Sequence, residues 1–416
     1  MVIQRIGTGG MEQYPFDFWE KNHLKFSQSF PKPESLRLKP NGPYAFKSWF
    51  KTIFFRMLDA IGSRLFAPSR PTIDWGSVQK IAVIRLDQLG DALLALPCLE
   101  ALSQAIPQAR IDFYVGPGSK DIVEISRLKI GIEIFAAPWF SKETTQSWSW
   151  KSIWELKRRL QKNDYDVVID LRGDFRHILA MKLAGIPVRI GQTRTGGGFL
   201  LTHPVVYHFQ SHEVDQNLLL LSQVGVKTNW GSEIPRLFPN PEDETEANRV
   251  IHSLKLTKPI VALHATCTVA ARQWPAENWR KLVDNIPDGF DVVIIGSKNE
   301  ITNMEEIFEK CSRKVILAAG LFNLRALTAF LKQSKLFIGV NSGPAHIAAA
   351  VGIPVLSLFS GTNSADQWKP RGLKVTVLQK ITACSPCERA ECPLDNECMR
   401  QIDVKEILDL VRLRLK

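Results

Sequence analysis

A turn at residues 341–346 of the 416-residue chain has residue types suited to binding a phosphate. Within FIGVNSGPAHIAAAVGIPVLSLFSG, a predicted buried strand ends and a helix of small residues begins. The residues at this joint are Asn341, Ser342, Gly343, Pro344 and His346. Unpaired N–H groups and the helix dipole make such a helix start an anion site, and the glycine allows close approach. The alternative is an ordinary strand–turn–helix joint with a core histidine.

A second polar segment, LHATCTVAARQWPAENW, follows another predicted strand. Its hydroxyls at Thr266 and Thr268 and the guanidinium of Arg272 could together hold a diphosphate. Guanidinium groups suit this role because they donate two parallel hydrogen bonds to phosphate oxygens. A solvated loop without a ligand is the alternative.

A third candidate is Asp91 in RLDQLGDALLALP, where a strand turns into a helix. An aspartate at a helix start often serves only as a cap for the backbone. At the carboxyl end of a strand it could instead act as a general base that removes a proton from a substrate hydroxyl.

These residues follow strands that alternate with helices, first from Lys80 and again from Pro259. Such alternation predicts parallel sheets in an α/β protein. Two series predict two Rossmann-like domains that face one another across a cleft. The expected parts are an extension (1–77), an N-terminal domain (78–240), a linker (241–257), a C-terminal domain (258–400) and a C-terminal helix (401–416).

The N-terminal extension has two predicted parts. Residues 1–44 are polar and interrupted by prolines, which indicates irregular structure. Residues 45–66, AFKSWFKTIFFRMLDAIGSRLF, have apolar residues at helical spacing and basic residues between them. A basic amphipathic helix rich in Trp and Phe can lie in a membrane interface. It can also pack its apolar face on the protein body, and both interpretations stay open.

The net charge of +11 favours an anionic partner, such as nucleotide phosphates or an anionic membrane surface. Nucleic acid is not expected, because the basic residues are scattered and form no recognised module. No apolar run approaches about 18 residues, and the first residues lack a signal-peptide pattern. The expected location is the cytoplasm, with the inner face of the cytoplasmic membrane as a possible site of peripheral attachment.

Taken in order, several motifs resemble those of glycosyltransferase family 9, the lipopolysaccharide heptosyltransferases of GT-B fold. They are LGDALLALP, DLRG with RHILAMKLAGIPVRIG, LHAT with RQWPAENW, and NSGPAHIAAAVGIPVLSLF. The resemblance covers about residues 79–402. It implies an inverting, metal-independent transferase without a cofactor. The implied donor is a nucleotide diphosphate sugar, an ADP-linked heptose, and the implied acceptor is a lipopolysaccharide core or another cell-envelope glycan.

The same resemblance makes 78–240 the acceptor domain and 258–400 the donor domain, and it assigns roles to single residues. Asp91 matches the family's catalytic base, and Thr266 and Arg272 match residues at the donor phosphates. Glu300 matches an acidic residue at the ribose. The donor diphosphate loop corresponds to Asn341, Ser342, Gly343, Pro344 and His346.

The chain departs from the family pattern at Arg272, where a lysine is usual, and at Asn341, where an aspartate is usual. The segment between Thr266 and Arg272, CTVAA, is also less polar than expected. The loss of a negative charge at Asn341 and the altered loop leave an alternative open. The chain could be a catalytically silent member that binds a glycan or nucleotide as an assembly partner.

Two further segments carry less specific expectations. Arg189, just before the glycine-rich TRTGGGF, and Arg194, within it, could meet an anionic acceptor. That segment itself is predicted to be a mobile loop. Four cysteines near the C-terminus, whose spacing fits no common metal motif, are predicted to be structural thiols rather than metal ligands. They are Cys384, Cys387, Cys392 and Cys398.

Overall fold

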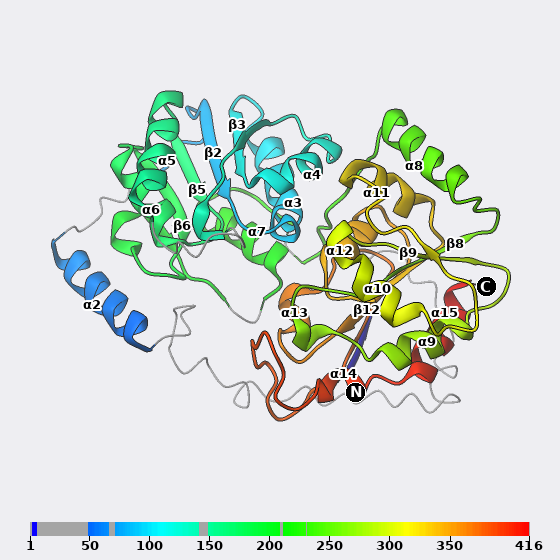
Figure 1. The fold of residues 1–416 in the computed structure, drawn as a ribbon. Helices are drawn as coiled ribbons and strands as arrows, with labels where there is room; N and C mark the ends of the chain where they lie inside the picture. The colour runs from blue at the N-terminus through cyan, green and yellow to red at the C-terminus, as the bar shows by residue number, and fades with distance from the viewer. Residues whose placement is uncertain are drawn as a thin grey trace. The chain divides into compact units, whose positions relative to one another are not determined.

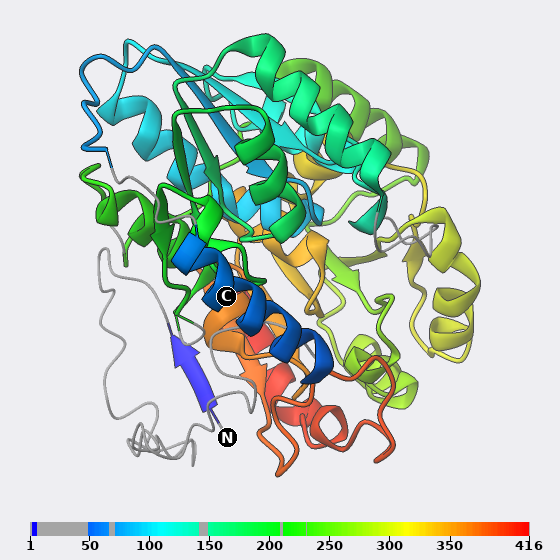
Figure 2. The same cartoon turned by 90° about the vertical axis from the view of Figure 1, so that its left-hand side faces the viewer.

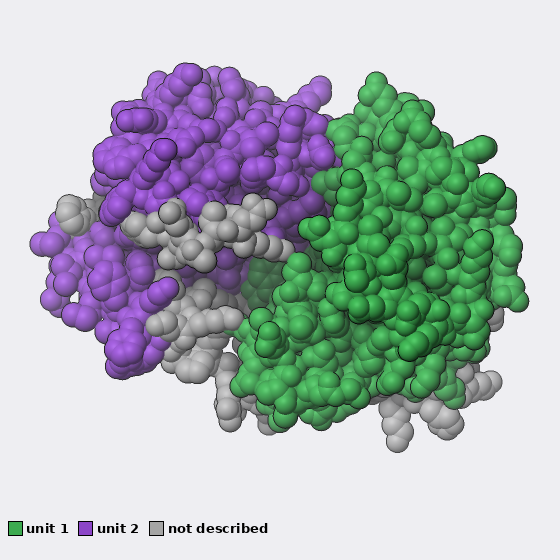
Figure 3. Space-filling model, in the orientation of Figure 1, with its two compact units in different colours: residues 1–30, 234–416 green, residues 31–233 purple. Residues whose placement is uncertain are grey.

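The computed structural model describes residues 2–5, 49–65, 71–140, 149–208, 211–229 and 231–415. The chain forms two compact units, which Figure 3 shows in different colours. Unit 1 comprises residues 1–30 and 234–416, and unit 2 comprises residues 31–233. Each unit contains one sheet with helices packed around it (Figure 1). The expected pair of parallel-sheet α/β domains is confirmed, whereas the domain limits given above remain predictions.

Unit 2 contains the six strands β2 (Lys80–Arg85), β3 (Arg110–Val115), β4 (Gly131–Ile134), β5 (Val167–Asp170), β6 (Val188–Gln192) and β7 (His203–Val205). Its helices are α2 (Trp49–Leu65), α3 (Leu89–Ala105), α4 (Lys120–Ile125), α5 (Trp150–Asn163), α6 (Phe175–Leu183) and α7 (Glu213–Gln223). These strands are parallel and follow the order β4-β3-β2-β5-β6-β7.

Unit 1 contains the strands β1 (Val2–Arg5), β8 (Ile260–His264), β9 (Asp291–Ile294), β10 (Ile316–Leu317), β11 (Leu336–Val340), β12 (Val355–Phe359) and β13 (Val375–Gln379). Its helices are α8 (Pro241–Ser253), α9 (Ala276–Asp284), α10 (Ile301–Phe308), α11 (Leu324–Gln333), α12 (Gly343–Ala350), α13 (Ala365–Trp368), α14 (Glu397–Arg400) and α15 (Val404–Leu415). The sheet order is β1-β13-β12-β11-β8-β9-β10.

Both sheets have one point where the strand order reverses. In unit 2 the chain runs outward from β2 to β4 and then returns to add β5 on the other side of β2. In unit 1 it does the same between β8 and β11. In open α/β sheets, ligands bind beyond the carboxyl ends of the strands at this reversal. The sheet order therefore points to the loops after β2 and β5, and to those after β8 and β11.

The strands that flank the reversal in unit 1 are buried along their whole length. β8 reads IVALH and β11 reads LFIGV, and every residue of both is buried. Continuous apolar runs are typical of parallel strands covered by helices on both faces. On one face, Ile338 of β11 belongs to a core that also contains Trp279 of α9 and Val411 of α15. This packing fixes the strand ends that carry the polar loops.

The predicted linker helix is α8, which packs against α11 within unit 1. Arg325 forms an ion pair of 2.7 Å with Asp243, and Lys332 forms one of 2.9 Å with Glu244. Among the described residues, no helix has both the length and the apolar character needed to cross a bilayer.

At the N-terminus, the prediction of irregular structure was wrong for residues 2–5. These residues form β1, which pairs antiparallel with β13, with Val2 opposite Gln379. The edge of a sheet offers unpaired backbone groups to an extended segment whatever its side chains are. The pairing therefore leaves little trace in the sequence pattern. The rest of residues 1–44, and residues 45–48 of the predicted helix, lie outside the described part of the chain.

Candidate active site

In unit 1, two predicted loops meet at the strand reversal. β8 and β11 are paired in parallel, with His264 beside Gly339, so the segments that follow them begin next to one another. After β11, Ser342 is the N-cap of α12, and Gly343 and Pro344 open the helix. The predicted arrangement of strand, turn and helix is present at this joint. A helix start at the reversal point provides backbone N–H groups for an anion.

Polar contacts through His264 join three of the predicted residues in unit 1. The Ser342 hydroxyl lies 2.9 Å from Nδ1 of His264, and Nε2 of His264 lies 3.6 Å from Glu300. The carboxylate oxygen of Glu300 that faces His264, Oε1, also accepts a hydrogen bond of 2.6 Å from the Thr266 hydroxyl. His264 is thus the link between the two loops, although the sequence pattern gave it no role beyond ending a strand.

The carboxylate of Glu300 is held in its ionised form. Burial acts to raise its pKa, but hydrogen bonds from His264, Thr266 and Ser297 outweigh burial and leave the pKa well below its usual value. Hydrogen bonds to the charged form of a carboxyl group favour that form. Glu300 is therefore an oriented acceptor that suits a hydroxyl-bearing ligand.

Arg272 lies at the end of the loop that contains Thr266. Its Nε donates a hydrogen bond of 3.2 Å to the hydroxyl of Thr362. Burial is the first cause of a lowered pKa at Arg272, which reflects a partly desolvated guanidinium. Among the described residues, no carboxylate forms an ion pair with this side chain. A partly desolvated cation that no described carboxylate neutralises is well suited to an anionic ligand.

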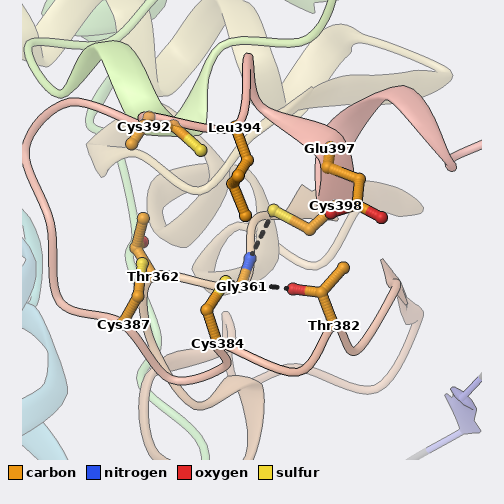
Figure 4. Close-up of a pocket in the computed structure, with 10 residues that line it drawn as sticks. Gly361, Thr362, Thr382, Cys384, Cys387, Cys392, Leu394, Glu397 and Cys398 are labelled. Atoms are coloured by element: carbon orange, nitrogen blue, oxygen red, sulfur yellow. Dashed lines mark hydrogen bonds between the residues drawn. The ribbon is translucent and has the colours of Figure 1, made fainter.

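Residues 384–398, the segment that contains the four C-terminal cysteines, support the loop that carries Arg272. The backbone N–H of Ala271 donates to the carbonyl of Ala390, and the Asn396 side chain donates to the carbonyl of Ala270. Figure 4 shows the four thiols around one small pocket, which Thr362 also lines. Their sulfur atoms are not joined in disulfides. Within the described ranges, no group of three or more His, Cys, Asp or Glu side chains is arranged to hold a metal ion.

In unit 2, a fully buried arginine organises the loops at the other strand reversal. Arg85, the last residue of β2, has no solvent-exposed surface. Its nitrogen atoms lie 2.8 Å from carboxylate oxygens of Asp87, Asp91 and Glu213. From the loop after β5, Arg172 forms a second ion pair of 2.7 Å with Asp87. Buried charges are tolerated when each is paired in this way.

Asp91 holds a position that is compatible with both predicted roles. Its Oδ2 accepts a long hydrogen bond of 3.3 Å from the backbone of Gln88, which is a capping contact. Its Oδ1 pairs with Arg85, and 12% of its side chain remains exposed. Burial, followed by the charge of Asp87, raises the pKa of Asp91 to about 6. A carboxylate with such a pKa is a stronger base than an ordinary aspartate and is still largely ionised at neutral pH.

The two candidate acceptor residues differ in their surroundings. Arg189 donates hydrogen bonds to the carbonyls of Leu200 and Ile186, so its side chain holds the loop beside it. Arg194 is 9% exposed and lies 4.2 Å over the ring of Tyr207. The Tyr207 hydroxyl in turn donates to Glu213, which places Arg194 beside the Arg85 cluster. Their binding roles remain predictions.

The sequence analysis missed several residues of the charged cluster around Arg85 in unit 2, because no motif marks them as reactive. The missed residues are Arg85, Asp87, Arg172, Tyr207 and Glu213. One signal was available in the sequence: charged residues directly follow the apolar runs IAVI and VVI, both of which are buried. Charges at the carboxyl ends of buried parallel strands are expected to mark a ligand site.

Comparison with known proteins agrees with the observed fold and motifs. Residues 153–397, more than half of the chain, match the family model "Glycosyltransferase family 9 (heptosyltransferase)". A curated relative is lipopolysaccharide heptosyltransferase 3 of Escherichia coli K12. It is 29% identical over 294 residues, which cover 68% of this chain and 82% of the relative.

Two solved structures share the fold. One is a family 9 glycosyl transferase from Veillonella parvula, with a TM-score of 0.70 and 20% identity; the match covers 83% of this chain and 99% of that one. The other is the E. coli ADP-heptose lps heptosyltransferase II, with a TM-score of 0.65 and 20% identity. That match covers 81% of this chain and 98% of the other.

Proposed function

Because the chain belongs to glycosyltransferase family 9 and is therefore a glycosyltransferase, we propose that it moves a heptose-like sugar from an ADP-linked donor to a cell-envelope glycan. The proposed acceptor is a lipopolysaccharide core or a related lipid-linked glycan. Two findings support this choice of substrates: the relative named lipopolysaccharide heptosyltransferase 3, and the structural neighbour named for ADP-heptose.

The observation that carries the proposal is the combination of Arg272 and the start of α12 in unit 1. The partly desolvated guanidinium and the helix start at Ser342 and Gly343 provide positive charge for a diphosphate. In sugar transfer, negative charge grows on the leaving diphosphate in the transition state, so fixed donors aimed at it lower the barrier. In the proposal these groups act in place of a divalent ion, and Glu300 accepts a hydrogen bond from a donor hydroxyl.

The proposed base is Asp91 of unit 2. The acceptor hydroxyl gives its proton to Asp91 as its oxygen bonds to the anomeric carbon. The bond from that carbon to the diphosphate breaks, and the nucleoside diphosphate leaves with the electron pair. A single displacement of this kind inverts the anomeric configuration. Arg85 positions the carboxylate, and burial provides the basicity that the step needs.

Transfer assays with a panel of nucleotide diphosphate sugars and a lipopolysaccharide core acceptor test the proposal. We expect the highest kcat/KM with an ADP-linked heptose, an inverted product and no loss of rate on addition of EDTA. Calorimetry with the same donors measures the affinity of the protein for each of them, independently of turnover. Binding without turnover across the panel would contradict the transferase proposal and favour a silent binding partner. Loss of rate with EDTA would contradict the metal-independent mechanism.

The rate is expected to depend on pH through Asp91. Since the base must be ionised and its pKa is raised to about 6, kcat/KM should be near its plateau at neutral pH. It should fall about tenfold per pH unit once the pH drops below that pKa. Donor affinity, measured by calorimetry at the same pH values, is the control and should change much less. A rate that stays constant down to about pH 4.5 would rule out this assignment of the base.

A further inference from the structure

The helix α2 presents two faces of different chemistry, and among the described residues only one of them contacts the rest of unit 2. The residues of the inward face are Thr52, Phe55, Asp59 and Gly62. They are spaced three or four positions apart, which places them on one side of a helix. Figures 1 and 2 both show α2 at the outside of unit 2.

Specific contacts fix which face points inward. Asp59 accepts a hydrogen bond of 2.7 Å from the backbone of Gly197, and the ring of Phe55 packs edge-on against Phe175 at 5.1 Å. At Gly62 the helix lies so close to Phe199 that an added Cβ would be 2.6 Å from the ring. The glycine-rich loop that was predicted to be mobile is therefore the surface on which α2 sits.

The opposite face is apolar and exposed. Five large apolar side chains follow each other at spacings of four, three, four and four residues, and we call them the α2 stripe. They are Phe50 (77% exposed), Phe54 (60%), Met57 (59%), Ile61 (54%) and Leu65 (69%). At about 100° per residue, the stripe lies roughly opposite the inward face. A helix that only covered a core would have the reverse orientation, with its apolar face inside.

The charges of α2 complement an anionic surface. Its basic residues Lys51, Arg56 and Arg64 are all exposed, whereas its single acidic residue, Asp59, is bonded to unit 2. Trp49 is also exposed, at 60%, at the start of the helix. Aromatic and aliphatic side chains combined with Lys and Arg are typical of helices that lie in a bilayer interface.

We propose that α2 binds an anionic lipid bilayer, with the α2 stripe inserted at the level of the headgroups and the basic residues against lipid phosphates. The inward contacts at Asp59 and Gly62 would then hold unit 2 at the membrane surface. A second copy of the chain fits this face less well, because two such helices would bring their basic residues together. The inference concerns lipid binding alone and holds whatever sugar the enzyme transfers.

Vesicle flotation with the full-length protein tests the inference. Wild-type protein should float with vesicles that contain about one third phosphatidylglycerol, and much less with phosphatidylcholine alone. The variant Phe54→Gln/Met57→Gln/Ile61→Gln should reduce the bound fraction at least tenfold. The charge variant Lys51→Gln/Arg64→Gln should reduce it about threefold to tenfold, with the larger loss at low salt. All five side chains are exposed, so the melting temperature should not change.

A matched control removes exposed apolar side chains elsewhere. Leu373 and Ile381 of unit 1 are 58% and 60% exposed, and Leu373→Gln/Ile381→Gln should float like wild type. The inference fails if wild-type protein does not float with anionic vesicles, or if the triple variant floats as well as wild type. It also fails if wild-type protein is a dimer that becomes monomeric in the triple variant while neither form binds vesicles. Transfer to a soluble acceptor fragment should be the same in all variants, which separates this test from that of the proposed function.

Discussion

Replacement of Asp91 by asparagine is expected to lower the rate of sugar transfer by about 100-fold to 10,000-fold. Asparagine has nearly the same size and can still accept a hydrogen bond from Arg85, but it cannot take the proton of the acceptor hydroxyl. Because the proposed diphosphate site lies in unit 1, the affinity for the donor should stay close to that of wild type. Initial rates at saturating donor and calorimetric donor binding measure the two effects separately.

The matched control for this variant is Asp121→Asn. Asp121 also lies in the first turn of a helix of unit 2, but that helix is α4 rather than α3. A change in helix capping alone should cost both variants a similar and small amount of stability. If Asp91→Asn transferred sugar within about threefold of wild type, the residue would be a cap and not the base.

The variant Arg85→Met is expected to show the second large effect, a loss of folding stability. Methionine has a similar length but leaves the carboxylates of Asp87, Asp91 and Glu213 without the cation that they share. Removing one member of a buried charge network lowers the free energy of unfolding by about 3–5 kcal/mol at neutral pH. Hydrogen exchange of unit 2 peptides during a urea titration would measure the loss separately from unit 1.

The difference in the free energy of unfolding between wild type and Arg85→Met should shrink as the pH falls. In wild type, burial acts to raise the pKa of Asp87 and Glu213. The charge of Arg85, together with the other cations and hydrogen bonds at each carboxylate, outweighs burial and leaves both pKa values below the usual range. Those carboxylates stabilise the fold above their unfolded pKa, and that stability is lost as the pH falls through the folded pKa. Without Arg85, burial dominates, so the folded variant binds protons and gains stability as the pH drops.

Two further variants make this stability test specific. Glu213→Gln, combined with Arg85→Met, removes one uncompensated charge and should recover part of the loss. Arg110→Met is the control on the neighbouring strand β3, where the arginine side chain is 65% exposed and paired with Asp112. Asp112 is buried but keeps a hydrogen bond from the Tyr165 hydroxyl, and the guanidinium of Arg110 is largely solvated, so the loss is expected to be about 1 kcal/mol or less. Equal losses for Arg85→Met and Arg110→Met would contradict the central role of the buried network.

The sequence by itself determined the secondary structure around the candidate site. Continuous apolar runs mark β8 and β11, and the small residues after Gly343 mark the start of α12. These features depend on neighbours within a few positions, which is why a single sequence reveals them. The motifs also placed Thr266, Glu300 and Ser342 in one site, and the network through His264 brings those three side chains together.

Only the tertiary structure decided which distant residues meet. Arg85 and Glu213 are 128 positions apart, and their contact depends on the strand order and on where α7 packs. The same holds for α2, whose periodic sequence revealed an apolar face but not its direction. That direction is set by the loop at Gly197 and Phe199, more than 130 residues further along the chain. Periodicity describes one element, whereas burial and pairing depend on neighbours that the fold brings from elsewhere.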